Sequence, residues 1–189
     1  MTLSIAWRMR SLEALPGSTL PQLANLAQRL ISALVATERT VACAESCSAG
    51  ALANSLALCD GAGDVLIGGF VTYMASAKTD LLGVPAALIE THSAVSRPIT
   101  RALAEGVLDR TAADLALAVT GVTGPVPDER GNPRGRIYLA AATRSGHGVD
   151  CHCEFGNSSP TVLVDAALRT VLALGEEALY GLVEIPAAH

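Results

Sequence analysis

Lysine is almost absent from this sequence of 189 residues. Of its 13 basic residues, Lys78 is the only lysine and the rest are arginine. Arginine stays protonated in proteins, whereas burial can lower the pKa of a lysine amine until it acts as a base. A catalytic amine is therefore the one basic role that arginine cannot fill. Chance placement of a surface lysine is the alternative, and composition alone leaves both open.

Charge and long apolar runs are also scarce. Charged residues make up 16% of the chain and the formal net charge is -5 without a basic cluster, so we expect no nucleic-acid partner. The longest uncharged stretches, residues 14–28 and 46–59, are shorter than the ~18 apolar residues of a spanning helix, so we expect no membrane partner. Residues 1–10 lack the apolar run of a secretory signal, which predicts a cytoplasmic protein. The hydrophobic content of 50% favours a homodimer, because a small domain leaves part of this apolar surface exposed.

The five cysteines are an odd number, and without a secretory signal we expect free thiols rather than disulfides. Cys151, His152 and Cys153 together suggest zinc ligands. On a strand, however, the two sulfurs share one face and the imidazole points away, and no paired CxxC motif occurs elsewhere. We therefore expect neither a metal site nor another cofactor.

Helical and strand patterns alternate along the chain. Residues 1–18 show no sustained period and are expected to form an N-terminal arm or a short leading helix, and residues 19–189 to form one domain. The patterns predict helices at 23–34, 48–58, 74–82, 85–90, 97–111, 160–174 and 176–182, and strands at 40–44, 65–73, 114–120, 136–143 and 149–155. This alternation predicts an α/β fold, a three-layer α/β/α sandwich around a mixed sheet.

Three predicted strand ends are rich in polar and small residues: residues 45–50, 70–78 and 120–125. In α/β folds, ligands bind beyond the carboxyl ends of strands. A serine at a strand-to-helix junction is either a helix cap or a nucleophile beside backbone N–H groups that stabilise an oxyanion. Because a lysine can activate a serine hydroxyl, Ser46 and Lys78 are candidates for such a pair.

These segments occur in an order that resembles one known family. Residues 44–50 (AESCSAG), 69–73 (GFVTY) with Lys78, 82–84 (LGV), 92–96 (HSAVS) and 120–125 (TGVTGP) are similar to the C-terminal domain of the competence/damage-inducible protein CinA. The resemblance covers roughly residues 23–182. It implies a metal-independent amidohydrolase that converts nicotinamide mononucleotide, a small-molecule substrate, into nicotinic acid mononucleotide and ammonia.

The resemblance also implies roles for individual residues. Ser46 would be the nucleophile, Lys78 its general base, and Tyr73 a support for proton transfer or for the substrate. Backbone N–H groups of residues 48–50 would stabilise the oxyanion. The implied substrate-binding residues are Glu45, Ser48, Ala49, Gly50, Thr120, Gly121, Gly124 and Arg134, with Arg130 as an alternative to Arg134. For Glu45, a structural role is the open alternative.

The chain departs from the family pattern in three places. Residues 48–50 read Ser-Ala-Gly where the family has Thr-Gly-Gly, and residues 126–135 are more acidic and richer in proline than the family's glycine-rich loop. Asn157 and Ser158 stand where the family has Asp-Arg. If that arginine holds the phosphate, a nucleotide would bind poorly here. Two alternatives therefore remain: a Ser–Lys amidohydrolase for an amide without a phosphate, and a binding domain without turnover.

Overall fold

The structure, a computed structural model, describes residues 3–10 and 21–180. Its centre is a six-stranded mixed sheet in the order β1-β6-β5-β4-β2-β3. The strands are β1 (Ala6–Arg10), β2 (Val41–Glu45), β3 (Leu66–Val71), β4 (Leu115–Gly121), β5 (Arg136–Thr143) and β6 (His147–Glu154). β2 runs parallel to both β3 and β4, whereas β5 is antiparallel to β4 and β6.

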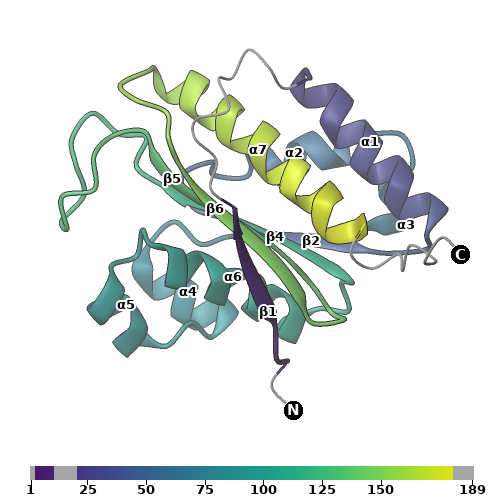
Figure 1. Cartoon of the computed structure of the whole chain (residues 1–189), viewed down its shortest axis with the longest axis horizontal. Helices are drawn as coiled ribbons and strands as arrows, with labels where there is room; N and C mark the ends of the chain where they lie inside the picture. The colour runs from purple at the N-terminus through teal and green to yellow at the C-terminus, as the bar shows by residue number, and fades with distance from the viewer. Residues whose placement is uncertain (1–2, 11–20, 181–189) are drawn as a thin grey trace, which may run out of the picture.

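Helices cover both faces of this sheet (Figure 1). One face carries α1 (Leu23–Ala36), α2 (Ala51–Ala57), α3 (Ala62–Val65) and α7 (Pro160–Tyr180). The other face carries α4 (Ala75–Leu82), α5 (Ala86–His92) and α6 (Arg97–Arg110). This arrangement confirms the predicted three-layer α/β/α sandwich.

The two faces of the sheet differ in the size of their side chains. Along β4, Leu115, Leu117 and Val119 pack into the core beneath α1 and α7. Ala116 and Ala118 alternate with them and pack on the side of α6. Because successive strand residues point to opposite faces, one uninterrupted apolar strand builds two separate cores.

Residues 6–10 form strand β1, which pairs in parallel with β6 from Ala6 opposite His147 to Arg10 opposite Cys151. The prediction of a short leading helix is therefore wrong for these residues. A strand of five residues carries little periodic signal, and its partner lies at the other end of the sequence. The rest of the predicted N-terminal arm lies outside the described residues.

Most helix boundaries differ from the prediction by one or two residues, and the larger differences are in α7 and α2. α7 continues through Gly175, where we expected a break, and residues 181–182 lie outside the described part. A Cβ at Gly175 would come within 2.9 Å of Leu117 Cδ2, so glycine serves close packing of α7 on β4 rather than a helix end. α2 begins at Ala51 instead of Ser48, because residues 46–50 form a turn.

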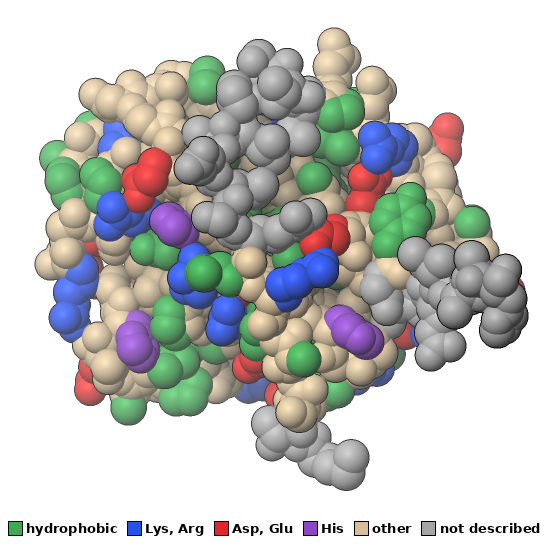
Figure 2. Space-filling model, viewed as in Figure 1, with side chains coloured by type: hydrophobic (Ala, Val, Ile, Leu, Met, Phe, Trp, Pro, Cys, Tyr) green, Lys and Arg blue, Asp and Glu red, His purple; other side chains and the backbone are tan. Residues whose placement is uncertain are grey.

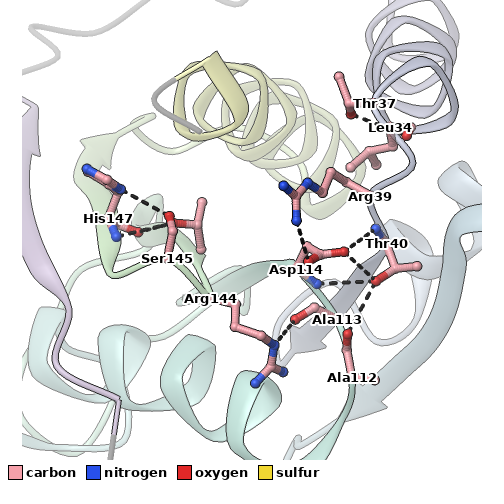
Figure 3. Close-up of polar contacts among 11 residues, drawn as sticks. Leu34, Thr37, Arg39, Thr40, Ala112, Ala113, Asp114, Arg144, Ser145 and His147 are labelled. Atoms are coloured by element: carbon pink, nitrogen blue, oxygen red, sulfur yellow. Dashed lines mark hydrogen bonds and ion pairs between the residues drawn. The ribbon is translucent and has the colours of Figure 1, made fainter. Parts of the chain in front are cut away.

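Polar contacts join the amino-terminal ends of β2 and β4 (Figure 3). Asp114 accepts hydrogen bonds from Thr40 N–H (2.9 Å), Thr40 Oγ1 (3.1 Å) and Arg39 Nη1 (3.2 Å). Burial opposes ionisation, but these hydrogen bonds hold the pKa of Asp114 below its usual value. Arg144 Nε donates to Ala113 O (2.9 Å) nearby. These contacts align the two strands at the end opposite the candidate site.

The cysteines are free thiols, and Cys151 and Cys153 pack in the core while exposed His152 stacks on Tyr138. The alternation predicted for this segment is thus confirmed. No group of metal-ligating side chains forms among the described residues, and none of the helices found there could span a bilayer. On the face shown in Figure 2, arginine and acidic side chains are interspersed.

Candidate active site

The carboxyl ends of β2, β3 and β4 meet at one edge of the sheet. The strand register places Glu45 beside both Val71 and Val119, so the segments that follow these residues leave the sheet together. The three polar strand ends thus lie together at the edge where α/β folds bind ligands. A cavity of about 260 Å³ lies there, lined by Ser46, Cys47, Tyr73, Val95, Gly121, Val122, Thr123, Gly124, Val126 and Asp128.

Ser46 and Lys78 form a buried pair at this cavity. Lys78 Nζ lies 3.1 Å from Ser46 Oγ and donates to Thr72 O at 2.6 Å. Only 1% of Lys78 and 8% of Ser46 is exposed. Burial lowers the pKa of Lys78 from 10.5 to about 8, although the neighbouring Cys47 opposes this shift. The single lysine is therefore not a surface residue, and part of its population carries a neutral amine near neutral pH.

Glu45 ends β2 and is fully buried. Its Oε2 accepts hydrogen bonds from Gly50 N–H and Leu52 N–H, both at 3.0 Å, and its Oε1 from Ala53 N–H at 2.8 Å. The Ser48 hydroxyl donates to Oε2 at 2.7 Å. The carboxylate thus caps the first turn of α2 from the protein interior. Glu45 does not line the cavity, so the structure places it behind the serine turn rather than at a substrate.

The turn from Ser46 to Gly50 offers fewer free donors than the sequence suggested. Gly50 N–H is bound by Glu45, and Ala49 N–H donates to Ser46 O at 3.2 Å. Ser48 N–H has no acceptor within the described residues, which makes it the remaining candidate oxyanion donor of the three. Ala49 adopts a left-handed φ of 51°, a strained conformation for a residue with a Cβ.

The other predicted binding residues separate into two groups. Gly121 and Gly124 line the cavity. Thr120 does not, because it is fully buried and its hydroxyl hydrogen-bonds to Thr100 Oγ1 at 2.7 Å. Arg134 is half-buried away from the cavity lining, and Arg130 donates to the backbone oxygen of Glu90. Neither arginine reaches the cavity.

Six residues of the cavity lining were not among the predicted site residues: Cys47, Val95, Val122, Thr123, Val126 and Asp128. Burial raises the pKa of Cys47 to about 12, so its thiol stays protonated beside Ser46. Val95 and Asp128 come together because Asn132 Nδ2 donates to Val95 O at 3.1 Å and to Asp128 Oδ2 at 2.7 Å. Val95 lies in the 92–96 motif that carries the family resemblance, and Asp128 lies in the acidic loop of residues 126–135, but the sequence assigned neither of them a role.

Fold and site together define a three-layer α/β/α domain with a buried serine–lysine pair at the carboxyl edge of its sheet. Residues 23–179 match the CinA C-terminal domain, and the chain belongs to that family. β1 lies outside the matched residues.

Curated relatives are similar over part of their length. A CinA-like protein of Akkermansia muciniphila is 40% identical over 126 residues, which is 67% of this chain and 30% of that protein. A CinA-like protein of Mycolicibacterium gilvum is 46% identical over 116 residues, 61% of this chain and 27% of that protein. The chain thus matches about a third or less of either relative.

Solved structures match more completely. The competence/damage inducible protein CihA of Agrobacterium tumefaciens is 35% identical with a TM-score of 0.80, covering 85% of this chain and 98% of that one. A competence-damaged protein (CinA) superfamily protein of Escherichia coli is 29% identical with a TM-score of 0.77, covering 85% and 96%. These matches extend the similarity from the sequence motifs to the fold of 85% of the chain.

Proposed function

We propose that the protein is an amidohydrolase in which Ser46 attacks a carboxamide and Lys78 is the general base. The observation that carries this proposal is the 3.1 Å separation of Lys78 Nζ and Ser46 Oγ at the cavity wall. Thr72 O holds one amine hydrogen of Lys78, which leaves the lone pair of the neutral amine free to face the serine hydroxyl.

The reaction divides into acylation and deacylation. Lys78 takes the proton of Ser46 Oγ as this oxygen bonds to the carboxamide carbon, and the Ser48 N–H stabilises the oxyanion. Protonated Lys78 then gives its proton to the amide nitrogen, the C–N bond breaks and ammonia leaves. A water molecule, deprotonated by Lys78, attacks the acyl group, and the proton returns to Ser46 Oγ as the carboxylic acid is released.

The substrate that the family resemblance suggests is nicotinamide mononucleotide, which would yield nicotinic acid mononucleotide. The neutral form of Lys78 at mildly alkaline pH supports this chemistry without a metal. An amide without a phosphate is the second candidate, because neither Arg130 nor Arg134 lines the cavity.

Ammonia release distinguishes these functions. Purified protein is incubated with nicotinamide mononucleotide and, separately, with nicotinamide riboside, and ammonia is measured in both. We expect release that disappears in Ser46→Ala and persists in Ser32→Ala, a matched control on the exposed side of α1. Release from the riboside alone would favour the amide without phosphate. If neither substrate releases ammonia, the proposed amidohydrolase activity is contradicted and a binding domain without turnover is favoured.

The oligomeric state and the cellular location of the protein remain predictions. A homodimer is tested by light scattering on the purified chain. A cytoplasmic location is tested by fractionating the cells that produce it.

A further inference from the structure

The cavity beside Ser46 presents one aromatic ring and one carboxylate. Tyr73 is 67% exposed and lines the cavity, and the structure records no hydrogen bond of its hydroxyl to a described residue. Asp128 lines the same cavity from the loop between β4 and β5. Among the described lining residues, Asp128 is the only one with a side chain that is charged at neutral pH.

Asp128 is held in place by uncharged donors. Its Oδ1 accepts hydrogen bonds from Arg130 N–H (3.0 Å) and Asn132 N–H (2.8 Å), and its Oδ2 from Asn132 Nδ2 (2.7 Å). The same amide group ties the loop to Val95 on the cavity wall. These contacts fix the carboxylate without a charged donor. The hydrogen bond to Glu154 raises the pKa of Arg136, and the charge of Asp128 adds to this rise, so Arg136 lies within electrostatic reach of the carboxylate.

The nearby arginines are directed elsewhere. Arg130 donates from its guanidinium to Glu90 O. Arg136 Nε binds Glu154 Oε1 at 2.6 Å, and its Nη1 donates to Asn132 Oδ1 at 3.2 Å. In the described part of the chain, no arginine or lysine forms an ion pair with Asp128. When Lys78 is neutral, Asp128 is therefore the charged group on the described cavity lining, and Arg136 behind it is paired with Glu154.

We propose that Asp128 and Tyr73 recognise the positively charged ring of an N-substituted pyridinium carboxamide. The carboxylate attracts the ring cation, and the face of the tyrosine ring adds a cation–π contact. A neutral pyridine or benzene carboxamide lacks both attractions. This inference rests on the proposed amide hydrolysis, because Ser46 has to reach the carboxamide of the same ring.

A binding measurement tests the proposal without requiring turnover. In the Ser46→Ala background, dissociation constants are measured by calorimetric titration for the N-methylnicotinamide cation and for neutral nicotinamide, which share ring and carboxamide. We expect the cation to bind about tenfold more tightly. Asp128→Asn should remove most of this preference. Glu129→Gln, which removes the same charge from the adjacent exposed position, should retain it.

Two further measurements separate recognition from loop folding. Raising the salt concentration should weaken binding of the cation and leave that of neutral nicotinamide unchanged, in the protein that keeps Asp128. Tyr73→Phe should keep the preference for the cation, whereas Tyr73→Leu should lower it severalfold.

The outcomes distinguish this inference from the proposed function. Equal affinity for the two rings, binding of neither, or an unchanged preference in Asp128→Asn would overturn the cation site. Hydrolysis of nicotinamide mononucleotide could still be present in that case. Conversely, a protein that binds the cation selectively but releases no ammonia would support the cation site and contradict the proposed amide hydrolysis.

Discussion

At the scale of one residue, the surroundings of Lys78 set two requirements on its amine. Burial favours the neutral amine, and the hydrogen bond to Thr72 O requires that one hydrogen remain on it. A neutral amine satisfies both, and its lone pair is then available to Ser46. An arginine could make similar hydrogen bonds but would introduce a permanent charge into the same buried space.

The first prediction concerns that permanent charge. Lys78→Arg should lower kcat of ammonia release by a factor of about 100 or more, because the guanidinium cannot accept the serine proton. The variant's secondary structure is checked by circular dichroism so that loss of folding is recognised. Turnover within a few-fold of the unmodified protein would exclude Lys78 as the base.

The second prediction links Lys78 to stability. Its pKa is about 8 when folded and 10.5 ordinarily, so between these values the unfolded chain binds the proton more tightly. The free energy of unfolding should therefore rise with pH across this window, by about 3 kcal/mol in total from this group. Below pH 8 the contribution should be flat.

Lys78→Met provides the control for this pH dependence. Urea unfolding of both proteins is followed across the window, and the difference between them is compared at each pH. Cysteines also titrate there and are present in both proteins. Their contributions cancel except at Cys47, where burial raises the pKa and the charge of Lys78 partly lowers it. A difference that does not change with pH would show that the folded amine keeps its ordinary pKa.

The Ser46–Lys78 pair could be predicted from the sequence because the single lysine, the order of the motifs and the positions at strand ends all indicated it. The sequence left the function of Glu45 open between the substrate site and a structural role. The side chain of Glu45 points into the protein, where four donors surround it. That direction depends on the start of α2, which local patterns placed three residues too early.

At the scale of elements, α2 depends on a cap supplied by the preceding strand. Glu45→Ala should lower the free energy of unfolding by about 3 kcal/mol, because several buried N–H groups lose a charged acceptor together. Chemical denaturation measures the change. Ser48→Ala removes only one donor to the same carboxylate, and its effect should be clearly smaller. Equal effects of the two variants would contradict an interior cap.

Two glycine positions test close packing of the helices. Gly175→Ala improves helix propensity by about 1 kcal/mol but forces overpacking worth about 1–3 kcal/mol against Leu117, so we expect net destabilisation. The Cβ added by Gly63→Ala in α3 has no atom within 4 Å, so this substitution should leave the stability unchanged or raise it. Thermal unfolding of the two variants gives the comparison. A stabilised Gly175→Ala would show that α7 can move away from β4.

At the scale of the whole molecule, the three layers were predictable but the strand order was not. Alternation of helices and strands implies a covered sheet, and apolar β4 reads as a central strand. The antiparallel pairing of β5 between β4 and β6, and the parallel addition of β1, depend on contacts between distant segments. In one such contact, the indole ring of Trp7 packs against Gly148. A Cβ added at Gly148 would lie 2.7 Å from this ring.

β1 therefore offers the last prediction, since it covers the edge of β6 outside the family match. Trp7 Nε1 donates to Glu105 Oε1 at 2.8 Å, and the Arg101 guanidinium lies 5.1 Å from the centre of the indole ring. Arg101 in turn binds buried Asp150 at 2.5 Å. Trp7→Ala should lower the free energy of unfolding by about 2–4 kcal/mol, measured by urea denaturation.

Deleting residues 1–10 extends this test from one side chain to the whole edge. The unpaired N–H and C=O groups of β6 would then be free to pair with another copy, so light scattering should show more association than in Trp7→Ala, which keeps the strand backbone. The serine–lysine pair lies at the carboxyl ends of β2 and β3, several strands away. Ammonia release per folded molecule should therefore persist. Unchanged association on removal of β1 would show that this strand does not protect the edge.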